Sequence, residues 1–406
     1  MLNSEPINLG WLLEHRAIHT YFQPIVSVEK QRIIGLEALS RGLDENNKII
    51  MPQVLFSSPM AKDFNIDLDR LCRAKALENY KKIIDQGNDY FLFLNFDTSI
   101  LDKGVVGSGN LIDTVTSFGL SPSSIVIEIA ESKVHDRTSL LNFIEIHKRL
   151  GFLIALDDIG SDSSNLNRIL LVRPDIIKID REIIQNIDTD SYKQELFKAL
   201  VAIAKKTGTL VVAEGTETLA ETVTCLELGA NFIQGYYFAK PGPYDKHLIG
   251  TISMILPPLI SLYHNSKINK LQNEIVNRDL YEITLQKIAD LLSYIHPQAF
   301  DQKLKEIAFK NTVIQCCYIL DMAGKQITDT VNGTPAPKIN CHRMFQPDFK
   351  GADQSLKDYC LFIKSGFKKY ISEPYVSLAN GCHCVTASTI FRTFNSSYIL
   401  CIDFNL

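Results

Sequence analysis

Polar side chains recur in this chain where short apolar runs end. Nine polar residues stand at or next to such ends, and six of them are carboxylates: Glu37, Asn95, Glu128, Asp157, Asp158, Lys178, Asp180, Glu214 and Gln234. Like charges within a few ångströms raise one another's pKa values, so six carboxylates that converge need cations beside them. Carboxylate and amide oxygens, without histidine or cysteine, favour Mg²⁺, Mn²⁺ or Ca²⁺ over zinc.

The adjacent pair Asp157-Asp158 makes this chemistry more specific. One carboxylate of such a pair can bridge two metal ions while its neighbour binds the second, which is the arrangement of two-metal phosphodiester hydrolysis. A single acid after a strand is more simply a helix cap or a solvated side chain. Six acids, each directly after an apolar run, instead predict a shared site with a phosphodiester substrate.

The apolar runs themselves predict the elements that position these residues. Eight runs read as strands, at 21–26, 33–37, 91–95, 125–128, 153–158, 176–180, 210–214 and 232–234, and helical periodicity follows at 69–84, 140–150, 194–207 and 219–228. Alternation of buried strands with helices indicates a (βα)₈ TIM-like α/β barrel, whose active site lies at the carboxyl ends of the strands. An open doubly wound sheet is disfavoured, because no glycine-rich phosphate loop follows the first strand.

Seven ordered motifs resemble the EAL domain family. They are Glu37-Ala38-Leu39-Ser40-Arg41, Leu94-Asn95-Phe96, Glu128-Ile129-Ala130-Glu131-Ser132, Asp157-Asp158, Lys178-Ile179-Asp180, Ala213-Glu214-Gly215-Thr216-Glu217-Thr218 and Gln234-Gly235-Tyr236. The family comprises phosphodiesterases specific for cyclic di-GMP and non-catalytic receptors for the same dinucleotide. The resemblance therefore implies that this chain binds cyclic di-GMP and hydrolyses it to linear pGpG with a divalent cation, Mg²⁺ or Mn²⁺, whereas Ca²⁺ would bind and inhibit.

The resemblance also implies roles for individual residues. The first metal would be ligated by Glu37, Asn95, Glu128 and Asp157, and the second would be shared by Asp157 and Asp158. Lys178 would hold the attacking water, and Glu214 would contact the second metal or act as general base. Supporting roles fall to Glu131, Glu217 and Asp180, and the ligand-binding residues would be Gln23, Leu39, Arg41 and Gln234.

One loop departs from the family pattern. The family has Asp-Phe-Gly-x-Gly-Tyr-Ser-Ser-Leu after the first aspartate of the pair, and this chain has Asp158-Ile159-Gly160-Ser161-Asp162-Ser163-Ser164-Asn165-Leu166. Phe, the second Gly and Tyr are replaced. In the family this loop joins the second metal site to a dimer interface, so the change favours binding over turnover. The alternative function is accordingly a cyclic di-GMP receptor that is catalytically weak or inactive.

The pattern changes after Pro241-Gly242-Pro243, and we expect three parts: an EAL barrel at 1–245, a helical linker at 246–298 and a sensor domain at 299–406. Apolar residues from Ile268 to Ile295 repeat at three- and four-residue spacing, which fits a helix packed on its own domain or one paired in a homodimer. Strand signals at 313–320, 325–328, 385–391 and 398–404 predict an antiparallel sheet with helices on one side. That part resembles PAS-like or Cache-like sensors, which implies regulation of the barrel.

Composition is that of an ordinary globular protein, with 46% hydrophobic and 22% charged residues and a net charge of −4, which argues against disorder and against a duplex nucleic-acid binder. We expect no membrane span, because the longest apolar stretch, 248–263, contains Pro257 and Pro258. We also expect no secretory signal, and therefore a cytoplasmic location. The nine cysteines are most simply buried thiols. A zinc or redox site at Cys341-His342 and Cys382-His383-Cys384 is the alternative.

Overall fold

The computed structural model describes residues 8–57, 61–103, 107–129, 136–161, 167–333, 345–394 and 396–405. Its contacts divide the chain into two compact units, Met1–Lys267 (unit 1) and Ile268–Leu406 (unit 2). The division falls inside one long helix, α10 (Lys246–Leu292). The three-part division expected from the sequence stays a prediction.

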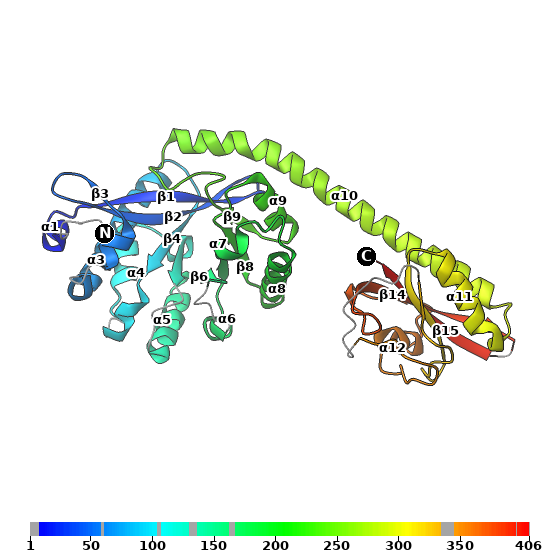
Figure 1. Ribbon diagram of the computed structural model, residues 1–406. Helices are drawn as coiled ribbons and strands as arrows, with labels where there is room; N and C mark the ends of the chain where they lie inside the picture. The colour runs from blue at the N-terminus through cyan, green and yellow to red at the C-terminus, as the bar shows by residue number, and fades with distance from the viewer. Residues whose placement is uncertain are drawn as a thin grey trace, which may run out of the picture. The chain divides into compact units, whose positions relative to one another are not determined.

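Unit 1 is a closed barrel of eight strands (Figure 1). The strands are β1 (Ile18–Ser27), β2 (Arg32–Leu43), β4 (Phe91–Phe96), β5 (Ile125–Ile129), β6 (Leu153–Ile159), β7 (Ile176–Ile179), β8 (Leu210–Glu214) and β9 (Phe232–Gln234). The short β3 (Ile49–Ile50) pairs with the end of β2. The barrel closes because β1 pairs with both β2 and β9, and the predicted TIM-like fold class is confirmed.

The first strand departs from the predicted parallel pattern. Strand β1 runs antiparallel to β2 over most of its length and antiparallel to β9 at Val26. The pairings among β2 and β4 to β9 are all parallel. The expectation of a regular β–α repeat from the first strand onward was therefore wrong at this point. The physical reason is the connection: only residues 28–31 separate β1 from β2, which is enough for a hairpin and too short for a crossover.

The helices of unit 1 surround this barrel (Figure 1). They are α1 (Leu9–Glu14), α2 (Pro52–Ser57), α3 (Ala61–Ile84), α4 (Asn110–Ser117), α5 (Arg137–Arg149), α6 (Asn167–Val172), α7 (Arg181–Ile184), α8 (Ser191–Thr207) and α9 (Leu219–Glu227), with 3₁₀ turns at Thr98–Lys103 and Pro122–Ser124. Local sequence sets their ends. Asp190 caps the start of α8 and Gly208, in the left-handed conformation, ends it, while Thr218 and Glu221 form a capping box on α9.

An apolar layer fills the barrel interior beneath the strand ends. In five parallel strands this layer is formed by Phe93, Val126, Ala155, Ile176 and Val212. Two positions further along the same strands stand Asn95, Glu128, Asp157, Lys178 and Glu214. Because side chains on one face of a strand repeat every second residue, the polar residues lie on the interior side, one step above the apolar layer. In the antiparallel β1 the order is reversed, and Gln23 precedes the apolar Ile25 by two residues.

Unit 2 is built on an antiparallel sheet with the order β11-β10-β15-β14-β12, and β13 pairs with β14. Its strands are β10 (Ile314–Asp321), β11 (Val331–Asn332), β12 (Lys369–Ile371), β13 (Tyr375–Val376), β14 (His383–Thr393) and β15 (Ser396–Asn405), and its helices besides α10 are α11 (Phe300–Lys310), α12 (Asp358–Lys364) and the 3₁₀ turn Pro297–Ala299. The strand predicted at 325–328 is only a pair of isolated bridges.

Helices cover both faces of this sheet, so the expectation of helices on one side was wrong. Alternate residues of β15 show this: Leu400 and Ile402 pack with α11 and the end of α10, whereas Ile399 and Cys401 pack with α12. The helix α12 (Asp358–Lys364) is only seven residues long, and its three buried residues are too few to give a clear periodicity in the sequence.

Helix α10 behaves differently along its length. Leu248, Ile252, Leu256 and Leu259 belong to the core of unit 1. In unit 2 the predicted seam Tyr281, Leu285, Ile288 and Leu292 is buried in that unit's own core. The earlier seam residues Ile268, Leu271 and Ile275 are exposed. The seam is therefore used within unit 2 from Tyr281 onward, and the predicted homodimer stays a prediction.

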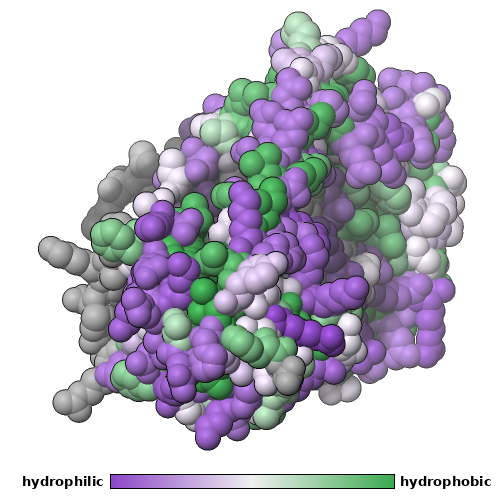
Figure 2. Space-filling model, turned by 90° about the vertical axis from the view of Figure 1, so that its right-hand side faces the viewer, coloured by the Kyte–Doolittle hydropathy of each residue, from purple (hydrophilic) through white to green (hydrophobic). Residues whose placement is uncertain are grey.

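On the face drawn in Figure 2, apolar residues are interspersed among hydrophilic ones. Within the parts of the chain that the structure describes, no helix is long and apolar enough to cross a membrane.

The described cysteines support the interpretation as buried thiols. Eight of them are free, and all but Cys382, which is partly exposed, are buried. Cys341 and His342, half of the alternative zinc or redox site, lie outside the described residues.

Candidate active site at the carboxyl ends of the barrel strands

Lys178 is the centre of the site. Its side chain is 1% exposed, and its ammonium nitrogen lies 2.5 Å from Glu128 Oε1 and 2.5 Å from Glu214 Oε1. The same nitrogen lies 3.4 Å from Glu37 Oε2 and 3.4 Å from Asp157 Oδ1. Five strands, β2, β5, β6, β7 and β8, thus contribute one charged group each. The structure brings together four of the six predicted acids around one buried cation.

Neutral amides complete the surroundings of Glu37. Asn95 Nδ2 donates to Glu37 Oε1 at 2.9 Å, and Gln234 Nε2 donates to Glu37 Oε2 at 2.5 Å. Gln234 Nε2 also donates to Gln23 Oε1 at 3.1 Å, so the amide row continues to the antiparallel strand β1. The predicted site residues Gln23, Asn95 and Gln234 therefore lie in direct contact with one another or with Glu37.

Charge and burial shift the pKa values strongly. Burial acts against ionisation of Glu37, but Lys178 and the hydrogen bonds from Gln234 and Asn95 hold its pKa below the usual value. For Glu128, burial and repulsion by Glu37 raise the pKa well above its usual range, and Lys178 only partly opposes this. Burial and Asp157 likewise raise the pKa of Glu214. One lysine is therefore too little positive charge for these carboxylates.

Lys178 itself is held in the charged form. Burial acts to lower its pKa, but the carboxylates of Asp157, Glu128, Glu214 and Glu37 together raise it well above the usual value. Its ammonium can therefore donate hydrogen bonds but cannot act as a base at neutral pH. Of the carboxylates in contact with it, both Glu128 and Glu214 have raised pKa values, and a raised pKa suits a carboxylate to accept a proton.

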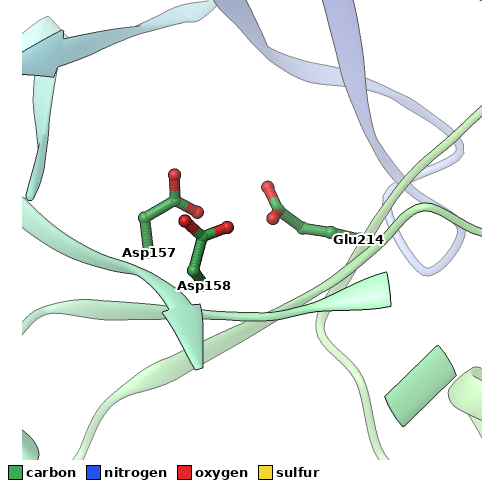
Figure 3. Close-up of side chains that lie close together, drawn as sticks. All are labelled: Asp157, Asp158 and Glu214. Carbon is green, nitrogen blue, oxygen red and sulfur yellow. The ribbon is translucent and has the colours of Figure 1, made fainter. Parts of the chain in front are cut away.

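A second cluster lies beside Lys178. Asp157, Asp158 and Glu214 each offer a carboxylate oxygen, and the three oxygens lie within 4.8 Å of one another. Figure 3 shows Glu214 pointing toward the two aspartates from the other side of the gap between them. Burial and the neighbouring Asp157 raise the pKa of Asp158 to about 6. Its backbone has φ +56°, a conformation that non-glycine residues rarely adopt and that aims its side chain away from the regular strand direction.

These residues fit divalent cations. Glu128 Oε2 and Gln234 Oε1 are buried oxygens with no hydrogen-bond partner in the described structure, a costly state unless another group binds them. The donors available are carboxylate and amide oxygens, which are the ligands that Mg²⁺, Mn²⁺ and Ca²⁺ take. Asp157, Asp158 and Glu214 surround one such position. The first cation position predicted at Glu37, Asn95, Glu128 and Asp157 stays a prediction, and the Lys178 ammonium lies among its three carboxylates.

Two predicted residues that the structure describes do not join this convergence, and a third, Glu131, cannot be placed. Asp180 caps α7, where its carboxylate accepts from the Glu182 amide at 2.7 Å. Glu217 is exposed and pairs with Arg181. Glu131 lies outside the described residues. The supporting roles that were predicted for the three stay predictions.

Leu39 and Arg41, which were predicted to bind the ligand, lie further along β2. The Arg41 side chain is largely buried; its guanidinium donates to the Ser40 carbonyl at 2.8 Å and its Cζ lies 5.3 Å from the centre of the Tyr21 ring. A cavity of about 400 Å³ opens beside Glu37, Leu39 and Asn95. There is thus room for an organic ligand directly next to Glu37 and Asn95.

The wall of this cavity holds a buried ion pair that was missed in the sequence. Arg73 Nη2 lies 2.6 Å from Asp69 Oδ2, and both residues are buried. Asp69 Oδ1 also accepts from the Asp97 amide at 3.3 Å, two residues after Asn95. The available signal was an i, i+4 acid–base pair on the apolar side of a predicted helix, which is more often an exposed pair.

The altered loop after the aspartate pair is partly visible. Ile159, which replaces the family's phenylalanine, is fully buried at the end of β6. Gly160 keeps a positive φ of +101°, and an added Cβ there would meet Ile183 Cδ1 at 2.0 Å, so glycine is needed at this position. Residues 162–166 lie outside the described residues.

A closed α/β barrel with buried carboxylates, amides and one lysine at its carboxyl rim defines a TIM-barrel protein with an acidic site suited to divalent cations. A model of the EAL domain family matches residues 9–241, more than half of the chain, and the chain belongs to this family. The resemblance seen in the seven motifs is thereby confirmed.

One relative resembles this chain over nearly its whole length, in sequence and in structure. The EAL-domain containing protein YkuI of Bacillus subtilis is 27% identical over 372 residues, covering 89% of this chain and 88% of YkuI. The crystal structure of YkuI, in complex with substrate c-di-GMP and calcium, superposes with a TM-score of 0.80 at 22% identity and covers 98% of this chain and 99% of that one. The fold of both units is therefore shared with YkuI.

Other relatives match the barrel alone. The cyclic di-GMP phosphodiesterase RocR of Pseudomonas aeruginosa is 28% identical over 242 residues, which is 58% of this chain and 60% of RocR. The structure of Klebsiella pneumoniae BlrP1 with manganese and cyclic di-GMP has a TM-score of 0.51 at 26% identity and covers 56% of each chain.

Proposed function

We propose that unit 1 binds cyclic di-GMP and hydrolyses it to the linear dinucleotide pGpG with divalent cations. The observation that carries the proposal is the buried set of four carboxylates around Lys178, with the second acidic cluster beside it. Membership of the EAL family supports the substrate, because relatives are cyclic di-GMP phosphodiesterases or were crystallised with c-di-GMP and calcium or manganese.

Bound at these positions, divalent cations would supply Lewis-acid activation of water and neutralise the phosphate oxygens. Glu37, Asn95, Glu128 and Asp157 would hold one cation, and Asp157, Asp158 and Glu214 the other. Lys178, which stays protonated, donates hydrogen bonds that orient the attacking water. As an alternative to binding the second cation, Glu214 would act as the general base that accepts the proton lost by this water.

The remaining residues position the dinucleotide. Arg41, two residues after Leu39 on β2, offers a positively charged planar donor group for a phosphate. Gln23 and Gln234 form the amide edge of the site on β1 and β9. The cavity of about 400 Å³ gives the bases a place outside the ring of carboxylates.

The proposal extends to regulation, assembly and location. Unit 2 would act as the sensor that controls unit 1, and the protein would work as a homodimer, which the exposed Ile268, Leu271 and Ile275 of α10 support. A cytoplasmic location is supported by the eight described cysteines, which are free thiols.

The direct test incubates the full chain with cyclic di-GMP and Mg²⁺ or Mn²⁺ and follows pGpG by chromatography, with a chelator as the control. Product that disappears with the chelator supports the enzyme. Binding without product supports the alternative function, a cyclic di-GMP receptor, which the replaced residues after Asp158 favour. Neither binding nor product would contradict both functions.

Replacing Arg41 by alanine should weaken cyclic di-GMP binding while leaving cation binding nearly intact. A hydrogen bond to a charged group contributes about 1.5–3 kcal/mol, so the dissociation constant should rise roughly 10- to 100-fold. Isothermal titration with the nucleotide, and separately with Mn²⁺, measures the two affinities. Arg32→Ala, at the exposed start of the same strand, is the matched control. An equal loss of both affinities in Arg41→Ala would show that the residue acts on the cations instead.

A further inference from the structure

The loop after β8 is held from two sides. Gly215 directly follows Glu214 and has φ +72°, and a Cβ at this position would meet Arg181 Cβ at 2.8 Å and Cγ at 2.9 Å. The aliphatic part of Arg181 therefore lies against the Gly215 backbone. The guanidinium then reaches Glu217, with Arg181 Nη2 at 2.9 Å from Glu217 Oε1. One side chain thus spans the loop from Gly215 to Glu217.

The other side of the loop is held by Glu221 of α9. The residue is 5% exposed, and its carboxylate accepts from three backbone amides: Glu217 at 2.9 Å, Thr218 at 3.1 Å and Asn186 at 3.0 Å. The first two belong to the loop after β8, and Asn186 belongs to the segment after α7. Glu221 and Arg181 together therefore fix the loop relative to α7, which follows β7.

This fixing bears on the cation site, because β7 and β8 carry Lys178 and Glu214, whose charged atoms are 2.5 Å apart. Arg181 is three residues after Lys178, and the loop that it spans begins at Glu214. The Arg181 and Glu217 side chains are 48% and 39% exposed, and ion pairs this exposed contribute roughly 0–1 kcal/mol to stability. Loss of this ion pair should therefore change the free energy of unfolding very little. It would, however, allow the loop to shift, and the loop begins at Glu214.

We propose that Arg181 is a positioning residue of the cation site: by spanning the loop from Gly215 to Glu217 it holds the Glu214 carboxylate toward Asp157 and Asp158. This inference rests on the proposed function of unit 1, since it assumes that these carboxylates bind a divalent cation. Arg181 is not one of the carboxylates that would hold the cation. Its contribution is the geometry of Glu214.

The test is Mn²⁺ binding to the full chain without nucleotide, followed by electron paramagnetic resonance or calorimetry. Arg181→Ala, which removes both the stem and the charge, should raise the Mn²⁺ dissociation constant about tenfold, in the range found when groups that orient metal ligands are lost. Arg181→Lys keeps the stem and a positive charge and should bind nearly as the original chain does. Thermal unfolding of both variants should stay within a few degrees of it.

Two further variants make the test specific. Glu217→Gln should weaken Mn²⁺ binding, and adding it to Arg181→Ala should cause no further loss, because both changes break the same contact. Arg149→Ala, which breaks the exposed pair with Glu145 on α5, is the control and should leave Mn²⁺ binding unchanged. Unchanged Mn²⁺ affinity in Arg181→Ala, or additive losses in the double variant, would overturn the inference. An original chain that binds no Mn²⁺ would overturn the proposed cation site as well.

Discussion

Lys178→Met is expected to destabilise the cation-free protein by about 3–5 kcal/mol, the usual cost of removing one partner from a buried ion pair. The methionine fills similar space but leaves Glu128, Glu214, Glu37 and Asp157 without their positive neighbour. Urea denaturation in the presence of a chelator measures the loss. Hydrolysis of cyclic di-GMP should fall by at least about 100-fold, because the donor that orients the water is gone.

Divalent cations should reverse much of this destabilisation. Mn²⁺ binds the folded carboxylates and not the unfolded chain, so it stabilises the folded state by mass action, and the effect should be larger in Lys178→Met than in the original chain. Lys82→Met, at an exposed pair on α3, is the matched control and should change stability by less than about 1 kcal/mol. If Lys178→Met unfolds at the same urea concentration as the original chain, the ammonium is not the internal counter-ion of the site.

Glu37→Gln is expected to abolish most cation binding without harming the fold. The amide keeps the shape of the side chain and can still bond to Asn95 or Gln234, but it removes a carboxylate whose low pKa keeps it ionised. The Mn²⁺ dissociation constant should rise by at least about 100-fold, since loss of a group that only orients a ligand already costs 10- to 100-fold. Cyclic di-GMP affinity measured with Mn²⁺ should fall with it.

The thermal stability of Glu37→Gln distinguishes the loss of a cation ligand from misfolding of the variant. Removing the charge of Glu37 loses its attraction to Lys178 but also relieves its repulsion of Glu128 and Glu214. Because these effects oppose each other, the thermal midpoint of Glu37→Gln without cations should stay within a few degrees of that of the original chain. Glu29→Gln, in the exposed turn between β1 and β2, provides the same change of charge and should leave Mn²⁺ binding unchanged. Retention of full Mn²⁺ affinity by Glu37→Gln would contradict the assignment of Glu37 as a cation ligand.

The barrel could be predicted because each buried parallel strand has a recognisable sequence pattern, an apolar run that ends in a polar residue. Every run from 91–95 to 232–234 is a strand in the structure within two residues. The direction of a strand relative to its neighbours has no such pattern. The antiparallel β1 was therefore missed, although its short connection to β2 indicated a hairpin. The helical linker expected at 246–298 is one continuous helix from Lys246 to Leu292, which spans Pro257 and Pro258.

Within the site, the sequence indicated which residues would lie close together, but not that the Lys178 ammonium would lie at the centre of the carboxylates. The strand ends brought Glu37, Glu128 and Asp157 together as expected, whereas the central place of Lys178 follows from side-chain length and depth in the barrel. The Asp69–Arg73 pair was missed because an i, i+4 pair looks the same in sequence whether it faces water or a cavity wall. Contacts of Arg181 with a distant loop had no local signal.

The apolar floor and the polar rim of the barrel belong to the same strands, two residues apart. An insertion or deletion of one residue inside any of these strands would turn every following side chain to the opposite face, which exchanges the barrel interior with the helix-facing surface. Proteins with this barrel can therefore change their chemistry by substitutions at the polar rim or by changes in the length of the loops that follow the strands. Insertions or deletions within the strands should be rare, because they would disrupt the barrel interior. Comparing where gaps and substitutions fall among relatives would show this constraint directly.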